Sequence, residues 1–106
     1  MDFTITKEQN QIRDEIINYA QENLNNKNEL NCFSTETWKK AAEFGLFGIS
    51  VPEKYGGLGE SYLTAAIASE ALGYACHNNG FIFAVNNHMW VGLNLILLFG
   101  SDYLKD

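Results

Sequence analysis

Five of the nine glycines and the only proline of this 106-residue chain lie in one stretch, Gly45–Gly59, which reads Gly-Leu-Phe-Gly-Ile-Ser-Val-Pro-Glu-Lys-Tyr-Gly-Gly-Leu-Gly. Glycine is useful where the backbone needs a positive φ or a close approach. Pro52 fixes its own φ and pushes Val51 towards an extended conformation. A flexible linker would be polar, whereas this stretch carries large hydrophobic side chains that have to be buried. It is therefore predicted to be a shaped connector that turns sharply at Gly56 and Gly57.

Two helices are predicted before this connector. A capping box at Thr6–Gln9 indicates the start of the first, because the two side chains can each satisfy an exposed backbone amide. Its apolar residues recur every four positions, and it is expected to end in the asparagine-rich stretch Asn23–Asn28. The second helix is predicted over Thr35–Phe44, with Ser34 or Thr35 as its N-cap.

Two further helices are predicted after the connector, over Ser61–Cys76 and Phe81–Phe99, the second ending at Gly100. Side chains at helical spacing are expected to face inward along the first three helices. These are Ile12, Ile16, Ala20 and Leu24, then Trp38, Ala41, Ala42 and Phe44, then Leu63, Ala66, Ile67, Ala71, Leu72 and Ala75.

The last predicted helix is apolar nearly all round, which is typical of a helix buried at the centre of a bundle. Asn86, Asn87, His88 and Asn94 interrupt it, and polar groups are costly in lipid, so we expect a core helix rather than a membrane span. No segment alternates long enough to predict a strand. The sequence predicts an all-α fold, a helical bundle of about four main helices with a Gly/Pro-rich connector, forming one domain over residues 1–106.

The composition restricts the functional class. The net charge is −6 and the seven basic residues are scattered, which argues against nucleic-acid binding. Cys32 and Cys76 are far apart and form no disulfide framework, so reduced thiols and a cytoplasmic location are expected. The opening residues lack the features of a signal peptide.

Catalytic motifs are absent from the sequence. It has no Cys/His cluster at metal-ligand spacing, no Gly-x-Ser-x-Gly elbow, no P-loop and no dinucleotide fingerprint after a strand. Glu70 lies on a predicted helix among apolar residues, and we interpret it as a capping, paired or solvent-facing carboxylate. The residues alone predict a helical domain with no catalytic site and no metal.

The stretch Trp38–Gly59 nevertheless resembles the N-terminal domain of the flavin-dependent acyl-CoA dehydrogenases, in which a Trp-bearing helix runs into Gly-Leu-x-Gly-x-x-Val-Pro-Glu-x-Tyr-Gly-Gly-x-Gly. Phe3–Gln9 is similar to the start of that family's first helix, and Ala68–Gly73 to its glutamate-bearing third helix. The late segment from His88 to Phe99-Gly100-Ser101 is also similar. One departure is Asn25-Asn26-Lys27, where the family usually places a proline.

The resemblance implies that the chain is a fragment of a longer FAD-dependent enzyme that acts on an acyl thioester of coenzyme A or of an acyl carrier protein. In that family a carboxylate removes the α-proton and a hydride passes from the β-carbon to the flavin. The base and most FAD contacts lie in later domains, so this chain is expected to be inactive alone and to pack against those domains. The family also implies a homo-oligomer, commonly a tetramer.

The resemblance also places a candidate substrate site on the last helix. The residues that it implies for the wall of the acyl pocket are Phe83, Ala84, Asn87, His88 and Val91. A second interpretation is that the amides and the imidazole of this helix bond to neighbouring helices or to other domains. Trp38, Phe47 and Tyr55 are interpreted as core and connector anchors. The alternative function is a non-enzymatic helical binding module that keeps the same scaffold.

Overall fold

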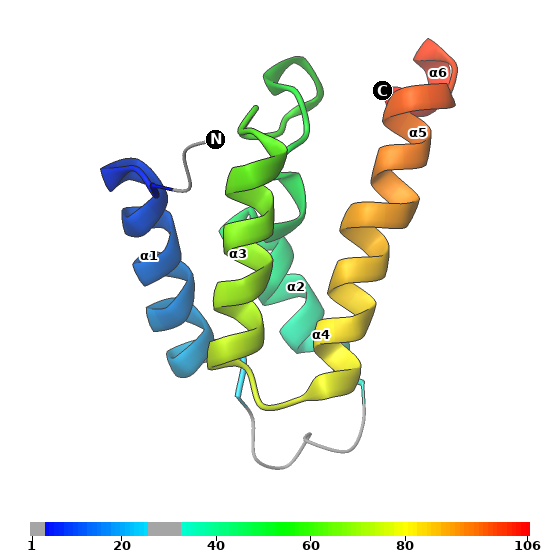
Figure 1. Cartoon of the computed structure of the whole chain (residues 1–106). Helices are drawn as coiled ribbons and strands as arrows, with labels where there is room; N and C mark the ends of the chain where they lie inside the picture. Colours follow the sequence, from blue (N-terminus) through cyan, green and yellow to red (C-terminus); the bar gives the residue numbers. More distant parts are fainter. Residues whose placement is uncertain (1–3, 26–32) are drawn as a thin grey trace.

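The computed structural model describes residues 4–25 and 33–106, and this part of the chain contains helices and no strand (Figure 1). Its elements are α1 (Lys7–Asn23), α2 (Thr35–Phe44), the short 3₁₀ turns η2 (Leu46–Gly48) and η3 (Glu53–Tyr55), α3 (Tyr62–Ala75), a long helix built from α4 (Asn79–Asn86), η4 (Asn87–Leu93) and α5 (Asn94–Phe99), and α6 (Asp102–Lys105). The prediction of an all-α bundle with one elaborate connector is confirmed.

The first two helices start at the predicted caps, and the third has a cap of the same kind. In α1, the Thr6 hydroxyl accepts a hydrogen bond from the Gln9 amide at 3.1 Å, and the Gln9 side chain accepts one from the Thr6 amide at 3.0 Å. Ser34 caps α2 through the Thr37 amide, and Ser61 caps α3 in the same way. These bonds satisfy amides that would otherwise have no partner at a helix start.

The core lies where α3 packs between α1 and α4 (Figure 1). Alanines dominate the buried face of α3, and their small side chains allow close approach of the flanking helices. Leu72 and Val85 are the largest side chains that are fully buried. The predicted stripe of α1 is confirmed, with Ile16 and Ala20 buried and Ile12 partly so.

The predicted inward face of α3 is partly wrong. Leu63 is 61% exposed and Ala66 is exposed as well. Because α3 is covered on two sides, its buried residues extend to Ala65 and Ala68, and a single stripe does not describe them. In α2, Ala42 and Phe44 are also exposed, contrary to the prediction.

Asn25, the first residue of the stretch that stands where the family usually has a proline, has a structural role. The Asn25 side chain donates to the Ala75 carbonyl at 2.8 Å and accepts from the His77 amide at 2.9 Å. It therefore ties the end of α1 to the end of α3. Asn26 and Lys27 lie outside the described residues.

The connector doubles back on itself, as predicted. Backbone bonds of 2.8 Å run from the amides of Leu58, Gly59 and Glu60 to carbonyls in the segment 48–51. Gly56 has a φ of 88°, which makes the sharp turn. The hydrophobic side chains near the start of the connector are buried, Leu46 and Ile49 most completely.

The long helix Asn79–Phe99 does not lie at the centre of the bundle. It forms one side of the molecule (Figure 1), and only 17% of its most apolar 18-residue window is buried. The expectation of a core helix was therefore wrong for this chain, because the elements in residues 4–25 and 33–106 cover one side of the helix and leave the other open. By length and composition alone, this helix could cross a membrane.

Candidate functional site

The middle of the long helix is a π-helix of seven residues, η4. The buried row along the helix repeats every four positions, at Phe81, Val85 and Met89. In an α-helix a four-residue row drifts around the axis by about 40° at each step. The wider turn of the π-helix offsets that drift. The wider turn of η4 therefore helps to keep Met89 in line with Phe81 and Val85 of α4.

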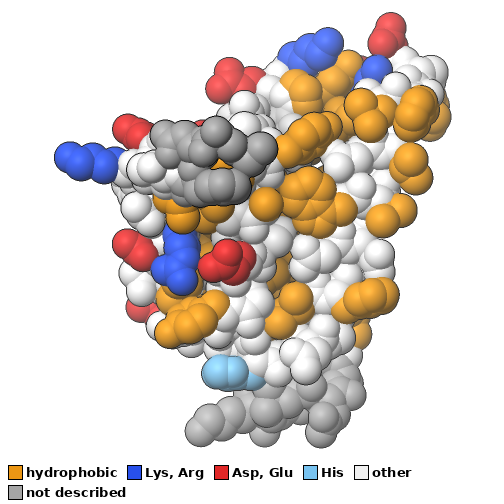
Figure 2. Space-filling view, in the orientation of Figure 1, with side chains coloured by type: hydrophobic (Ala, Val, Ile, Leu, Met, Phe, Trp, Pro, Cys, Tyr) orange, Lys and Arg blue, Asp and Glu red, His pale blue; other side chains and the backbone are white. Residues whose placement is uncertain are grey.

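The opposite row is exposed and contains three of the five predicted wall residues. Phe83 and Val91 are 69% and 53% exposed, and Asn87, which lies between them at four-residue spacing, is also exposed. Leu95 and Leu98 continue this row on α5. Figure 2 shows hydrophobic side chains along the edge of the molecule that this helix forms. We call the row from Phe83 to Leu98 the outer face.

The other two predicted residues lie on a neighbouring flank of the helix. Ala84 is half-buried, and His88 follows it by one turn. The His88 ring meets the rings of Trp38 and Phe47 edge-on, with centroids 5.4 and 4.9 Å apart. His88 therefore belongs to an aromatic cluster that joins α2, the connector and η4, which matches the interpretation of Trp38 and Phe47 as anchors.

A groove of about 280 Å³ begins at His88, between the connector and the last helices. Its walls are apolar side chains of α5 and the backbone of the glycine turn, with Tyr55 on one side and Lys105 at the C-terminal end. His88 is the one predicted site residue that lines it. Three of the wall residues thus lie on the outer face and His88 lies at the rim of the groove, while Ala84 belongs to neither surface.

A polar seam, which the sequence interpretation did not identify, attaches the long helix to α3. The Trp90 indole donates to the Ser69 hydroxyl at 3.2 Å. One turn further on, the Asn94 side-chain oxygen is buried without a partner among the described residues. Asn86, at the same spacing on the other side of Trp90, bonds its amide to the Ile82 carbonyl of its own helix. The four-residue spacing of Asn86, Trp90 and Asn94 is the sequence pattern from which this seam could have been predicted.

Ionisable groups are scarce around this site. The long helix carries no Asp, Glu, Lys or Arg, and Glu70 is exposed on α3. Burial raises the pKa of the Cys76 thiol, although a backbone hydrogen bond at Asn78 opposes the shift. Among the described residues, no group of three His, Cys, Asp or Glu side chains could hold a metal ion.

Comparison with known proteins identifies the family. The family model for the acyl-CoA dehydrogenase N-terminal domain matches residues 6–106. The chain belongs to the acyl-CoA dehydrogenase family. Within it, the chain is similar to the probable acyl-CoA dehydrogenase YngJ of Bacillus subtilis (strain 168), at 32% identity over 99% of this chain and 28% of YngJ.

Two solved structures extend the comparison. The prolyl acyl carrier protein oxidase AnaB is 37% identical and superposes with a TM-score of 0.89 over 96% of this chain and 28% of that one. An FAD-dependent dehydrogenase is 32% identical, with a TM-score of 0.84 over 99% of this chain and 27% of that one. The acyl-CoA dehydrogenase domain described here thus spans little more than a quarter of the length of these relatives.

Proposed function

We propose that the protein containing this domain catalyses the α,β-dehydrogenation of an acyl thioester, and that the domain supplies one wall of the acyl pocket. The observation that carries the proposal is the outer face, an exposed apolar row in a chain of the acyl-CoA dehydrogenase family. Contiguous exposed apolar surfaces mark sites that bind a ligand or another part of a protein. The base that removes the α-proton is assigned to another domain, because this domain offers no suitable carboxylate on that face.

The chemistry of the outer face favours a short or polar acyl group. Phe83 and Val91 provide apolar contact, but the Asn87 amide lies between them. Burying this amide against a long hydrocarbon chain would leave it without a hydrogen-bond partner, which costs free energy. An acyl group that is short, or that carries its own polar atom, avoids this penalty.

The cofactor we propose for the whole enzyme is FAD, which is consistent with the similarity to an FAD-dependent dehydrogenase. When bound, FAD supplies the two-electron acceptor that the reaction needs. The long helix has no Lys or Arg to hold a pyrophosphate. We therefore assign the FAD contacts mainly to other domains, and the role of this domain is to shape the acyl pocket and keep water from it.

A carrier-protein thioester is the second candidate substrate. AnaB, at 37% identity, is an oxidase of a prolyl acyl carrier protein, whereas YngJ is a probable acyl-CoA dehydrogenase. A prolyl group is short and polar, which agrees with the position of Asn87 on the outer face. We assign recognition of the carrier to parts of the enzyme that lie away from this wall.

The complete enzyme tests the proposal. After anaerobic mixing with butyryl-CoA, octanoyl-CoA or a prolyl carrier protein, the absorbance of oxidised flavin should fall with at least one of the three. Val91→Ala removes two methyl groups from the wall and so enlarges the pocket. This change should shift the preference towards octanoyl-CoA by about tenfold in kcat/KM. Leu63→Ala, an exposed apolar change on α3, is the matched control and should leave the preference unchanged.

The same experiment separates the enzyme from a non-enzymatic module that keeps this scaffold. A purified protein that contains no flavin, and that leaves all three thioesters unchanged, would support the module.

We also propose that the outer face packs in part against the remaining domains, and that the enzyme is a homo-oligomer. Sedimentation of the complete protein measures its oligomeric state.

A further inference from the structure

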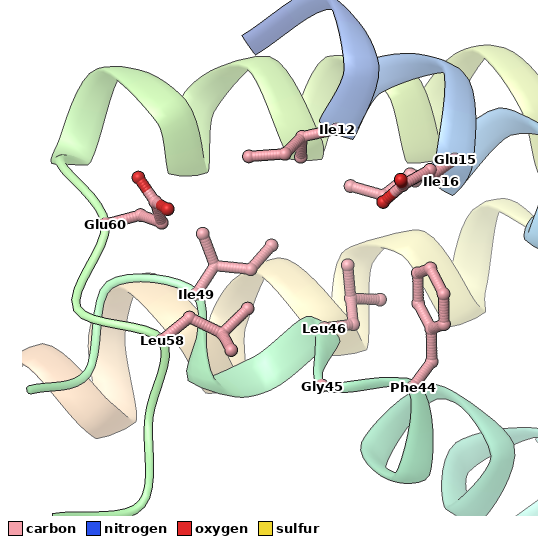
Figure 3. Close-up of a pocket in the computed structure, with 9 residues that line it drawn as sticks. All are labelled: Ile12, Glu15, Ile16, Phe44, Gly45, Leu46, Ile49, Leu58 and Glu60. Atoms are coloured by element: carbon pink, nitrogen blue, oxygen red, sulfur yellow. The ribbon is translucent and has the colours of Figure 1, made fainter. Parts of the chain in front are cut away.

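Two features of the domain, other than the candidate acyl wall, are open to solvent and to chemistry. One is a pocket between α1 and the connector, where an apolar floor lies between Glu15 and Glu60 (Figure 3). Both glutamates are exposed and every other lining residue is apolar or glycine, so this pocket selects no particular ligand. The other feature is the first turn of α4, where Asn79 is followed directly by Gly80.

Asn79-Gly80 is the only Asn-Gly pair in the sequence. In such a pair the backbone nitrogen of the glycine can attack the side-chain carbonyl carbon of the asparagine. Glycine favours this attack, because it has no Cβ to hinder the approach and its backbone adopts the required angles readily. Both residues are exposed, so water reaches the pair.

The position of the pair in the helix leaves the attacking nitrogen outside the helical hydrogen-bond ladder. The first bond of α4 along its backbone runs from the Ile82 amide to the Asn78 carbonyl at 3.1 Å, and the Gly80 amide precedes it. Asn87 and Asn94, by contrast, lie inside the long helix. The amides that follow them are held by hydrogen bonds within the helix.

We propose that Asn79 is a site of spontaneous deamidation. The Gly80 nitrogen forms a bond to Cγ of Asn79, the bond from Cγ to Nδ2 breaks, and the proton lost by the Gly80 nitrogen leaves with Nδ2 as ammonia. Water then opens the resulting five-membered succinimide at either carbonyl, which gives aspartate or isoaspartate. One water is consumed, one ammonia is released, and nothing is oxidised or reduced.

The two products differ in their effect on the long helix. Aspartate adds a negative charge at the N-terminal end of α4, where the helix dipole favours it. Isoaspartate inserts an extra carbon into the backbone between Asn78, whose side chain caps the helix, and Phe81, whose amide donates to that cap at 3.0 Å. Phe81 is 3% exposed and belongs to the buried row of the helix. Isoaspartate should therefore break the cap or displace Phe81.

The same cap restrains the reaction. Ring closure requires Asn79 to leave the helical backbone angles, so the first turn of α4 has to open before the bond to Cγ forms. The Asn78 cap opposes this opening, because it satisfies an amide at the helix start. The rate of deamidation therefore reports how often the first turn opens.

Ageing of the 106-residue chain at body temperature and mildly alkaline pH tests the proposal. Endoproteinase Glu-C cleaves after Glu70, the last glutamate of the chain, and releases the segment 71–106. Fragmentation of the Glu-C peptides in a mass spectrometer then locates each converted asparagine. Asn79 should convert before every other asparagine, with isoaspartate in excess over aspartate.

Gly80→Ala is the variant that tests the attack itself. It should slow the conversion of Asn79 by about tenfold, because alanine lacks the conformational freedom of glycine. The new Cβ would lie 3.4 Å from the side-chain oxygen of Asn78, a contact that this side chain can relieve by a small shift. Conversion of another asparagine while Asn79 stays intact, or an equal rate in Gly80→Ala, would overturn the proposal.

Variants of the cap test its role. Asn78→Ala removes the cap and should speed the conversion of Asn79 by about fivefold, whereas Asn78→Ser keeps a capping hydroxyl and should stay within about twofold of the parent chain. The Phe81 amide signal in NMR spectra should move in the isoaspartate product and stay nearly in place in Asn79→Asp. Equal rates in the parent chain and Asn78→Ala, or an unmoved Phe81 signal in the isoaspartate product, would overturn the role assigned to the cap.

Discussion

Gly57 shows how one residue can be required for a reason that its backbone angles do not reveal. Gly45, Gly56 and Gly59 have positive φ values, but Gly57 does not. A methyl group at Gly57 would overlap the carbonyl oxygen and the Cβ of Val51. The two adjacent glycines of the turn therefore serve different needs, a left-handed turn at Gly56 and close packing of two backbone segments at Gly57.

Gly57→Ala is expected to destabilise the chain by about 3 kcal/mol, because the overlap is largely with backbone that cannot move aside. The matched control is Gly73→Ala on the exposed side of α3, where a Cβ would meet nothing within 4 Å. That change should stabilise the chain by about 0.5–1 kcal/mol, because alanine favours helix. Urea unfolding followed by circular dichroism measures both free energies. Equal effects of the two changes would contradict this account.

Cys76 provides a test that depends on pH. Burial raises the pKa of its thiol above the ordinary value of 9.0, so the folded chain keeps the thiol proton more firmly than the unfolded chain. The resulting stability is present below the unfolded pKa and is lost as pH rises through the folded pKa. In a Cys32→Ser background, the urea midpoint should fall more steeply between about pH 8 and pH 10 than in the same background with Cys76→Ala. Parallel pH profiles would argue against the shift.

At the level of elements, the predicted boundaries were nearly correct because their signals are local. The side chains of Thr6, Ser34 and Ser61 cap their helices by accepting hydrogen bonds from backbone amides three residues ahead, and such patterns can be read directly from sequence. The π-helix of η4 was missed, since its stability depends on which residues face α3 and the connector. The four-residue repeat at Phe81, Val85 and Met89 does not reveal it, because the regular α-helix α1 has the same repeat at Ile16 and Ala20.

The seam between η4 and α3 predicts an energetic coupling. Trp90→Phe and Ser69→Ala each remove the hydrogen bond between them, and each should cost about 1 kcal/mol of unfolding free energy. Because both changes remove the same bond, the double variant should cost less than the sum, by about 0.5–1 kcal/mol. Ser69→Ala combined with Asn18→Ala, an exposed change on α1, is the control pair. Strict additivity for Trp90 and Ser69 would show that the bond is not formed in solution.

At the level of the whole molecule, the limit of prediction was the burial of the long helix. Its composition is that of a core helix, yet Phe83, Val91 and Leu98 are exposed here. Composition reports what a helix has to bury, but not which part of a protein covers it. The sequence places all five candidate wall residues on this one helix, but their distribution among the outer face, its flank and the groove at His88 required the structure.

This exposure predicts self-association of the isolated chain. Apolar rows that lack their partner tend to bury one another, so sedimentation should show species larger than a monomer at rising concentration. Phe83→Gln with Leu98→Gln should reduce this association while the melting temperature stays nearly constant, because both side chains are more than 60% exposed. Leu63→Gln, on α3, is the matched control. A chain that stays monomeric at all concentrations would contradict the prediction.

The doubled-back connector also has a consequence for how the chain meets proteases. Glycine-rich loops are ordinarily the first places to be cut, but here the amides of Leu58, Gly59 and Glu60 are held by carbonyls across the turn. Lys54, the one basic residue between Gly45 and Gly59, lies within the η3 turn with its ammonium over the Tyr55 ring. A protease needs an extended strand of backbone, and this segment would have to unfold to provide one. The most glycine-rich part of the domain should thus resist digestion as firmly as its helices.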